Sequence, residues 1–128
     1  MRGRAIEIPA GLIGDIAGQE DESITLAAQR ELLEETGYEA QQWDIVTAGP
    51  NSPGLSDEVV YLVVARNLRK VGAGGGDGTE SIVVHEVPVA EVHPWLETRR
   101  QQGLAIDPKI YAGLFFLTSR VGDPEKNG

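Results

Sequence analysis

The sequence predicts an α/β domain in which helices pack on a mixed sheet. Its 128 residues, 41% of them hydrophobic, suit one compact domain, which we expect to span residues 1–128 with a frayed tail from Gly122. Short segments rich in apolar and β-branched residues alternate with longer segments that carry a helical pattern. Glycine and proline separate these segments, and no internal repeat is visible. This alternation favours a sandwich of helices and sheet.

The first part of the chain predicts a short strand followed by a helix. Residues 4–8 mix apolar and charged positions, as a short strand does. Residues 23–36 predict the helix, because Asp21 or Ser23 is placed to cap its start. Gly37 is placed to end it in the left-handed conformation.

The middle of the chain predicts two strands around a turn. Residues 43–47 form the first, and residues 59–65 form the second, which is apolar enough for a sheet interior. Residues 49–54 between them are turn-forming throughout. Residues 71–79 contain five glycines and make the most flexible stretch of the sequence.

The last part predicts one more strand and two helices. Residues 81–87 are β-branched and predict the strand, and residues 89–102 predict a helix in which Pro94 forces a late start or a kink. Asp107 is placed to cap a closing helix over residues 108–120.

The charge of the chain is concentrated in one segment. Twenty acidic and eleven basic residues give a net charge of −9, of which residues 15–39 carry −7. Affinity for nucleic acid comes from clustered Lys and Arg, so we expect no nucleic-acid partner. Zero Cys, no signal-peptide pattern and no apolar run long enough for a bilayer lead us to expect a cytoplasmic protein without membrane contact. A cation site is the first function to look for.

Two carboxylates of the predicted helix point toward its apolar side. On a helical wheel Glu31 and Glu35 lie about 40° apart, and Glu34 about 60° from Glu31. They sit in the last turns, where the helix dipole disfavours acids by roughly 0.3–1 kcal/mol each. A solvated acidic helix end is the alternative, but half-buried carboxylates need a paired charge or a metal. Oxygen ligands of this kind suit Mg²⁺ or Mn²⁺.

The end of the predicted helix contains the segment Arg30-Glu31-Leu32-Leu33-Glu34-Glu35-Thr36-Gly37-Tyr38, and Gly11 and Glu22 lie upstream of it. This pattern resembles the Nudix box of the Nudix hydrolases. Its second half matches at every fixed position. In the first half, ten residues rather than the usual five separate Gly11 from Glu22, so residues 13–21 resemble an insertion. The resemblance implies an α/β/α sandwich with a mixed sheet.

Two more stretches resemble the ADP-ribose pyrophosphatases within that family. Glu7-Ile8-Pro9-Ala10-Gly11 is similar to the segment that leads into their Nudix box, and Ser52-Pro53-Gly54 is similar to their downstream proline signature. The resemblance implies that this proline loop contacts the substrate on its terminal ribose side.

The resemblance also assigns site residues. It implies that Glu31, Glu35 and the Ala10 carbonyl bind metal, and that Glu34 is a ligand or orients water. Arg30 would orient a carboxylate, either Glu34 or Glu22. A later loop acid, Glu80 in preference to Asp77, would bind metal or activate water. We interpret Glu86 as a surface partner within a strand, and we interpret His85, His93, Trp43 and Trp95 as packing residues.

These roles imply Mg²⁺- or Mn²⁺-dependent cleavage of ADP-ribose to AMP and ribose 5-phosphate. Other nucleotide sugars, dinucleoside polyphosphates and dinucleotides remain alternative substrates, and a non-catalytic nucleotide-binding module is the alternative function. Members of the family usually have several strands before the box, whereas ten residues precede Gly11 here. We therefore expect a fold without those strands and with an exposed sheet edge. Either a partner subunit covers this edge or the chain is a shortened version of a longer protein, and we expect a homodimer.

Overall fold

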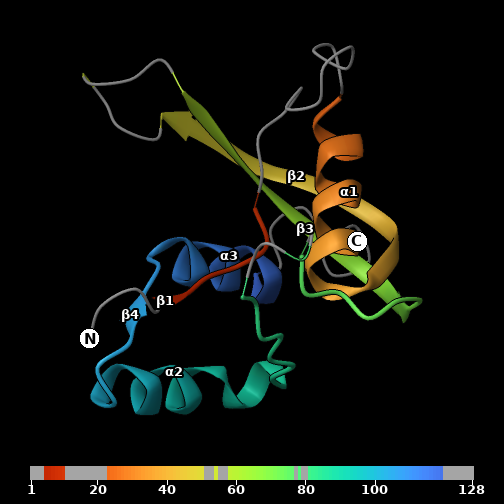
Figure 1. Cartoon of the computed structure of the whole chain (residues 1–128). Helices are drawn as coiled ribbons and strands as arrows, with labels where there is room; N and C mark the ends of the chain where they lie inside the picture. Colours follow the sequence, from red (N-terminus) through yellow and green to blue (C-terminus); the bar gives the residue numbers. More distant parts are fainter. Residues whose placement is uncertain are drawn as a thin grey trace.

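The computed structural model describes residues 5–10, 23–50, 54, 58–76, 78 and 81–119. The described elements form a long two-stranded ribbon with one helix on it, and two further helices beside a short strand pair (Figure 1). The elements in chain order are β1 (Ala5–Ile6), α1 (Ile24–Thr36), β2 (Tyr38–Pro50), β3 (Val59–Lys70), the 3₁₀ turn η1 (Val89–Glu91), α2 (Val92–Gln101), β4 (Ala105–Ile106) and α3 (Lys109–Thr118). The predicted α/β class is confirmed.

The described strands form two separate two-stranded sheets, one parallel and one antiparallel. β1 pairs with β4 in parallel, and β2 pairs with β3 antiparallel. The ribbon of β2 and β3 is much longer than the sequence predicts. Its paired residues run from Tyr38 opposite Lys70 to Pro50 opposite Val59. Backbone groups make the ladder, so its polar ends pair as well as its apolar middle.

Two irregularities shape this ribbon. The register shifts between Ile45 and Thr47, and Asn67 has a φ of 59°, in the left-handed region. Asn accepts that conformation more readily than most residues. Such irregularities bend and twist a strand pair, and Figure 1 shows the lower end of the ribbon curving around α1.

Helix α1 begins and ends as its sequence predicts. Ser23 is the N-cap, and its Oγ accepts a hydrogen bond from the amide of Leu26 at 3.1 Å. Gly37 closes the helix with a φ of 78°, and its amide donates to the carbonyl of Leu33 at 2.9 Å. The helix buries Ala27 against the ribbon. Both ends of the site-bearing helix are thus fixed by local sequence.

The hydrophobic core of the described residues is small. Helix α1 packs on β2 and β3, and α3 packs on β3, where the Arg66 guanidinium donates to the carbonyl of Leu117. The β1–β4 pair lies between α2 and α3 in Figure 1. Leu96 of α2 is the most buried side chain, at 2% exposure. The buried apolar residues are Ala27, Val64, Leu96 and Ile110.

One predicted strand is wrong. Residues 81–88 pair with no other strand in the described part of the chain, and Val83 is 65% exposed. β-Branched residues favour extended backbone, but a strand also needs a neighbouring edge for its hydrogen bonds. Tertiary context therefore overrides the local preference here.

The two C-terminal helices agree with the prediction. The segment from Val89 starts as the 3₁₀ turn, and Pro94 falls in the first turn of α2, where its missing N–H costs no hydrogen bond. The carboxylate of Asp107 accepts the amide of Lys109 at 3.0 Å at the start of α3. Asp107 therefore caps this helix as expected, although the helix begins and ends one or two residues inside the predicted range.

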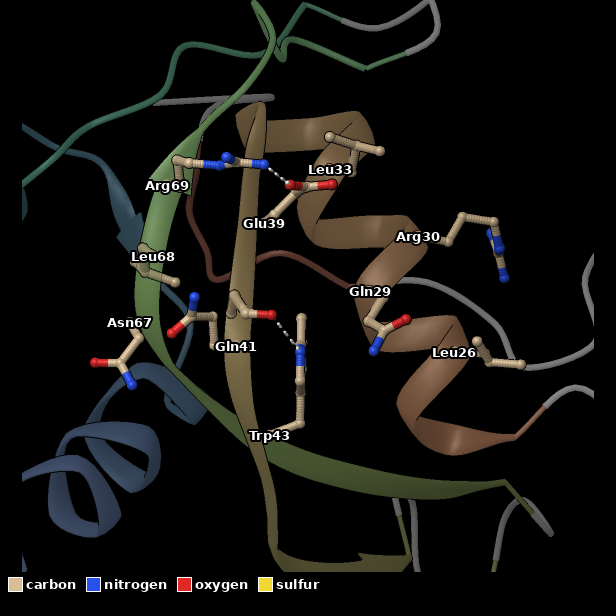
Figure 2. A pocket seen from close by; sticks show the side chains of 11 residues that line it. Leu26, Gln29, Arg30, Leu33, Glu39, Gln41, Trp43, Asn67, Leu68 and Arg69 are labelled. Atoms are coloured by element: carbon tan, nitrogen blue, oxygen red, sulfur yellow. Dashed lines mark hydrogen bonds and ion pairs between the residues drawn. The ribbon is translucent and has the colours of Figure 1, made fainter.

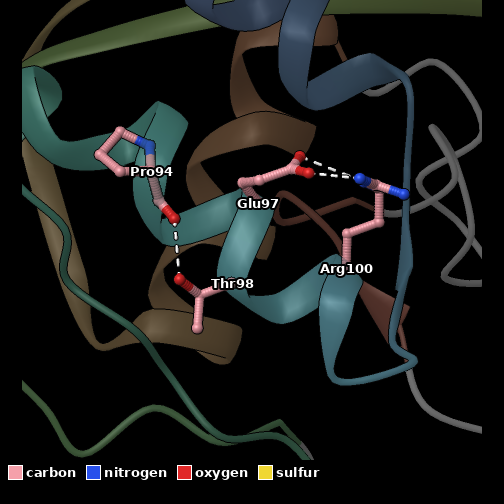
Figure 3. A network of polar contacts seen from close by, with 4 residues as sticks. All are labelled: Pro94, Glu97, Thr98 and Arg100. Carbon is pink, nitrogen blue, oxygen red and sulfur yellow. Dashed lines mark hydrogen bonds and ion pairs between the residues drawn. The ribbon is translucent and has the colours of Figure 1, made fainter.

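Polar contacts on α2 are local and exposed. Figure 3 shows Thr98 donating to the carbonyl of Pro94 at 3.1 Å, and Arg100 paired with Glu97 one turn earlier. The Arg100 guanidinium holds the pKa of the Glu97 carboxyl below its ordinary value. An exposed pair of this kind contributes little to stability.

Candidate metal and catalytic site

Two of the three predicted glutamates lie together on one half-buried face of α1. Glu31 and Glu35 are one turn apart, and the Glu31 side chain is 14% exposed. Glu35 is half-buried, whereas Glu34 is exposed. The last turn of α1 contains no basic residue, so no positive side chain in that turn offsets the negative end of the helix dipole.

A segment from near the N-terminus reaches this face. The backbone amide of Ala10 donates to Oε2 of Glu35 at 3.1 Å. The structure therefore brings together two residues that the sequence analysis predicts as neighbours in a metal site. The recorded contact uses the Ala10 amide rather than its carbonyl.

Arg30 pairs with its sequence neighbour. Its guanidinium Nη1 lies 2.6 Å from Oε1 of Glu31, and the two side chains are 15% and 14% exposed. The expected partners were Glu34 or Glu22; the first is not the recorded partner, and the second lies outside the described residues. Arg30 has further interactions besides this one. The pair sets the position of one carboxylate oxygen of Glu31.

The glycine-rich segment after β3 packs against the C-terminal end of α1. The amide of Gly75 donates to the carbonyl of Glu35 at 2.8 Å, and the amide of Gly76 donates to the carbonyl of Glu34 at 2.9 Å. The Gly37 carbonyl accepts the amides of Val71 and Gly72 at 2.8 and 3.1 Å. These donors satisfy carbonyls that a helix end leaves without partners. The sequence predicts this stretch as flexible; Val71, Gly72, Gly75 and Gly76 are instead hydrogen-bonded to the helix end.

This contact requires glycine at two positions. A Cβ on Gly37 would lie 2.2 Å from the carbonyl oxygen of Gly72. A Cβ on Gly74 would lie 2.5 Å from the carbonyl carbon of Thr36. Both residues also have a positive φ, which L side chains rarely adopt. The glycine-rich segment and the end of α1 therefore lie closer together at Gly37 and Gly74 than a residue with a side chain would allow.

The donor chemistry at this end of α1 fits a hard divalent cation. Glu31 and Glu35 supply carboxylate oxygens, and Mg²⁺ is usually held by one or two carboxylates together with waters and substrate phosphates. Within the described ranges, no three Asp, Glu, His or Cys side chains gather into a metal cluster. The described part of the chain therefore offers two carboxylates on one face, and Glu34 beside them.

A groove lies on the other side of α1. It has a volume of about 930 Å³ and runs between the helix and the ribbon (Figure 2). Figure 2 shows Trp43 between β2 and the helix, and Leu26 and Leu33 on the exposed surface of α1. On a helical wheel these leucines lie roughly opposite Glu31 and Glu35. The groove is thus separate from the carboxylate face.

Sequence reasoning missed this groove. Leu26 and Leu33 are seven residues apart and are 56% and 42% exposed. Leu26, Leu33, Gln29 and Arg30 share one face of a helical wheel, and this pattern in the sequence could have indicated the groove. Trp43 was predicted to pack; it is half-buried, and its Nε1 donates to the carbonyl of Ala40 at 2.9 Å.

The remaining predicted site residues fall mostly beyond the described part of the chain. Of the substrate-loop residues only Gly54 is described, as an exposed turn residue with a φ of 82°. The predictions that lie outside the described residues are those for Glu22, Ser52, Pro53, Asp77 and Glu80.

Glu86 and the histidines make local contacts. Glu86 accepts a hydrogen bond from the Tyr38 hydroxyl at 2.7 Å, which confirms that it pairs at the surface, although not within a strand. This bond raises the pKa of Tyr38. The His85 ring lies 5.0 Å from the Trp95 ring, and the His93 ring lies 6.2 Å from the Tyr111 ring, consistent with packing roles.

Comparison with known proteins identifies the family. Residues 2–109 match the NUDIX domain, and this range contains the carboxylate face of α1 and the Ala10 segment. The chain belongs to the Nudix family. The predicted resemblance to its ADP-ribose pyrophosphatase-like members is also confirmed by the relatives that follow.

Three relatives illustrate this similarity. The chain is 44% identical over 69 residues to an ADP-ribose pyrophosphatase of Mycobacterium tuberculosis, covering 54% of this chain and 31% of that protein. It is 37% identical over 95 residues to an ADP-ribose pyrophosphatase of Bacillus subtilis, covering 73% of this chain and 49% of that protein. It is 35% identical over 96 residues to a methanol dehydrogenase activator of Bacillus methanolicus, covering 74% and 49%.

The Nudix chain spans about half the length, or less, of these three relatives. Among the residues that the structure describes, no helix is long and apolar enough to cross a membrane.

Proposed function

We propose that this Nudix domain hydrolyses the pyrophosphate bond of a nucleoside diphosphate linked to a second moiety, with Mg²⁺ or Mn²⁺ as cofactor. ADP-ribose, cleaved to AMP and ribose 5-phosphate, is the proposed substrate. The observation that carries the proposal is the pair Glu31 and Glu35, half-buried on one face of α1 with the Ala10 segment held against Glu35.

In this proposal Glu31, Glu35 and the Ala10 carbonyl hold the divalent cation, with Glu34 beside them. The cation supplies charge neutralisation of the pyrophosphate and a lower pKa for water bound to it. The short Arg30–Glu31 contact supports a positioning role for Arg30.

Loop residues complete the proposed site. Glu80 or Asp77 accepts the proton of the attacking water. The loop with Ser52, Pro53 and Gly54 contacts the terminal ribose side of the substrate. These assignments rest on the match of the sequence to the family motifs.

The relatives support the substrate class. Two of them are named ADP-ribose pyrophosphatases, and others are named GDP-mannose pyrophosphatase and ADP-sugar pyrophosphatase. All three names refer to a pyrophosphate that joins a nucleoside to a sugar. A substrate panel should therefore include ADP-ribose, another ADP-sugar and GDP-mannose.

The test is an incubation of the protein with each substrate and Mg²⁺, followed by chromatography of the nucleotide products. We expect AMP from ADP-ribose, and a loss of at least about 100-fold in kcat for Glu35→Gln. Glu39→Gln is the matched control, because Glu39 is an exposed acid on β2 that pairs with Arg69 and not with the site. Equal rates for the wild type and Glu35→Gln on every substrate would refute the proposal.

The alternative is a nucleotide-binding module without catalysis. Calorimetry with ADP-ribose and Mg²⁺ separates the two, since a module would bind the nucleotide and release no AMP. Binding without product over the whole substrate panel would replace the hydrolase proposal with this one.

We also infer that residues 1–128 form one domain and that the protein is a cytoplasmic homodimer. The small buried core and the exposed apolar side chains of Leu26, Leu33 and Leu68 support association, since burying such surface is favourable. Light scattering should give twice the monomer mass at micromolar concentration. A stable monomer would rule out the dimer without affecting the hydrolase proposal.

A further inference from the structure

The end of α1 is held by a second segment as well as by its own cap. The amides of Gly75 and Gly76 donate to the carbonyls of Glu35 and Glu34. The side chain of Glu35 in turn accepts the Ala10 amide. Glu35 is therefore fixed from two directions, through its backbone by the glycine segment and through its carboxylate by the N-terminal segment.

Gly74 is what allows the glycine segment to approach this closely. A Cβ at this position would lie 2.5 Å from the carbonyl carbon of Thr36 and 2.9 Å from the carbonyl oxygen of Glu35. These neighbours are backbone atoms of the last helical turn, so no side chain can rotate to make room. A side chain at Gly74 would be accommodated only if the segment moved away from the helix end.

We propose that Gly74 is a positioning residue for the carboxylates of Glu31 and Glu35. It acts by seating residues 72–76 on the last turn of α1, which fixes that turn and therefore the position of Glu35 relative to Glu31, one turn earlier. This inference rests on the proposed function, in which those carboxylates bind a divalent cation. It assigns a role in site geometry to a glycine that lies outside the Nudix box.

A neighbouring glycine provides the matched control. Gly75 also has a positive φ, of 95°, but a Cβ there meets no atom within 4 Å. Gly74→Ala and Gly75→Ala therefore impose the same kind of backbone strain. Only Gly74→Ala adds the contact with the helix end, and Gly75→Ala keeps the amide that donates to Glu35. A difference between the two variants isolates the effect of the close approach.

The first experiment measures Mn²⁺ binding by calorimetry and steady-state kinetics with ADP-ribose for the wild type and both variants. We expect Gly74→Ala to weaken Mn²⁺ affinity about tenfold and to lower kcat by a similar factor, as loss of a supporting contact does at metal sites. Gly75→Ala should stay within about twofold of the wild type in both quantities, since it leaves the contact in place. A folded Gly74→Ala protein with wild-type Mn²⁺ affinity would overturn the inference.

The second experiment uses the wild type alone and remains informative if Gly74→Ala does not fold. If the glycine segment supports the cation site, cation binding must in return stabilise the segment. Hydrogen exchange followed by NMR should show slower exchange of the Gly75 and Gly76 amides on addition of Mg²⁺. The Gly103 amide, which donates to Arg100 at the end of α2, should be unchanged. Equal effects of Mg²⁺ at all three amides would contradict the inference.

These readouts separate the inference from the proposed function. A wild type that binds Mn²⁺ but cleaves no substrate would refute the hydrolase, while the binding and exchange data would still decide the role of Gly74. A wild type that cleaves ADP-ribose while Gly74→Ala matches Gly75→Ala would refute only the role of Gly74.

Discussion

The amide of Ala10 donates to Oε2 of Glu35 at 3.1 Å, across 25 positions of the sequence. This contact joins the N-terminal segment to the last turn of α1, where the helix dipole is negative and no basic residue offsets it. Glu35 makes a further interaction besides this one. The helix dipole nevertheless disfavours a negative charge at this end of α1.

Replacing Glu35 by Gln should weaken cation binding without lowering the stability of the metal-free protein. Gln keeps an oxygen that can accept the Ala10 amide and removes a charge that the helix dipole disfavours by roughly 0.3–1 kcal/mol. Without metal, we expect Glu35→Gln to melt at the wild-type temperature or slightly above it. With Mn²⁺ at about 100 times its dissociation constant, the wild type should gain about 2.7 kcal/mol and the variant much less.

Thermal melts with and without Mn²⁺, followed by circular dichroism, make this measurement. Glu39→Gln serves as control and should keep the full shift caused by Mn²⁺, because Glu39 lies outside the site. An Mn²⁺-dependent shift of the same size in Glu35→Gln would mean that this carboxylate does not bind the cation.

Two of the Arg–Glu pairs that the structure describes should respond differently to removal of the arginine. Arg30 and Glu31 are 15% and 14% exposed, whereas Arg69 and Glu39 are 78% and 52% exposed. Arg30→Ala leaves a largely buried carboxylate without this partner, which costs about 1–3 kcal/mol or more. Arg69→Ala should change stability by less than about 1 kcal/mol.

Urea unfolding of both variants checks the difference, and kcat/KM for ADP-ribose adds a second readout. We expect Arg30→Ala to lose about 10- to 100-fold in kcat/KM, because Arg30 positions a proposed metal ligand. Arg69→Ala should keep wild-type activity. If Arg30→Ala and Arg69→Ala lower the free energy of unfolding by the same amount, the low solvent exposure of the Arg30–Glu31 pair does not make it more stabilising.

Local signals in the sequence predict the helices of this fold well. Ser23 and Gly37 mark the ends of α1 because a capping hydroxyl and a left-handed glycine act within one turn of the chain. Pro94 and Asp107 likewise locate the starts of α2 and α3. The face that carries Glu31 and Glu35 follows from helical periodicity alone.

Side-chain partners and contacts between distant segments could not be predicted from the sequence. Glu31 pairs with its neighbour Arg30, although helix geometry favours partners three or four residues apart. The docking of Gly74 on the helix end depends on two backbones meeting, and glycine composition alone indicates only flexibility. Residues 81–87 have the β-branched composition of a strand but lack a partner among the described strands.

The N-cap of α1 should contribute to stability without contributing to chemistry. Ser23→Ala removes the oxygen that accepts the Leu26 amide and should cost about 1 kcal/mol. For a chain of this length that corresponds to a fall of about 4 °C in Tm. Ser81→Ala is the control, because Ser81 is exposed and has no hydrogen-bond partner among the described residues. If the Ser23→Ala and Ser81→Ala proteins have the same Tm, the Ser23 cap does not stabilise the helix in solution.

The hydrogen bond between Tyr38 and Glu86 should appear as a pH dependence at high pH. The carboxylate of Glu86 accepts the phenol proton at 2.7 Å, and this bond raises the pKa of Tyr38 above its ordinary value of 10.0. Because the folded state holds this proton more tightly than the unfolded state, the bond stabilises the protein fully below pH 10.0. Its contribution is then lost as the pH rises through the raised pKa.

Ultraviolet titration of tyrosinate, with Tyr38→Phe to identify the transition, measures this pKa directly. Glu86→Gln should move the Tyr38 transition to lower pH, since a neutral amide neither repels the phenolate nor holds the proton as strongly. The stability difference between the wild type and Tyr38→Phe, measured by urea unfolding, should also shrink between neutral pH and the raised pKa. A Tyr38 transition that stays in place in Glu86→Gln would show that this carboxylate does not hold the phenol proton.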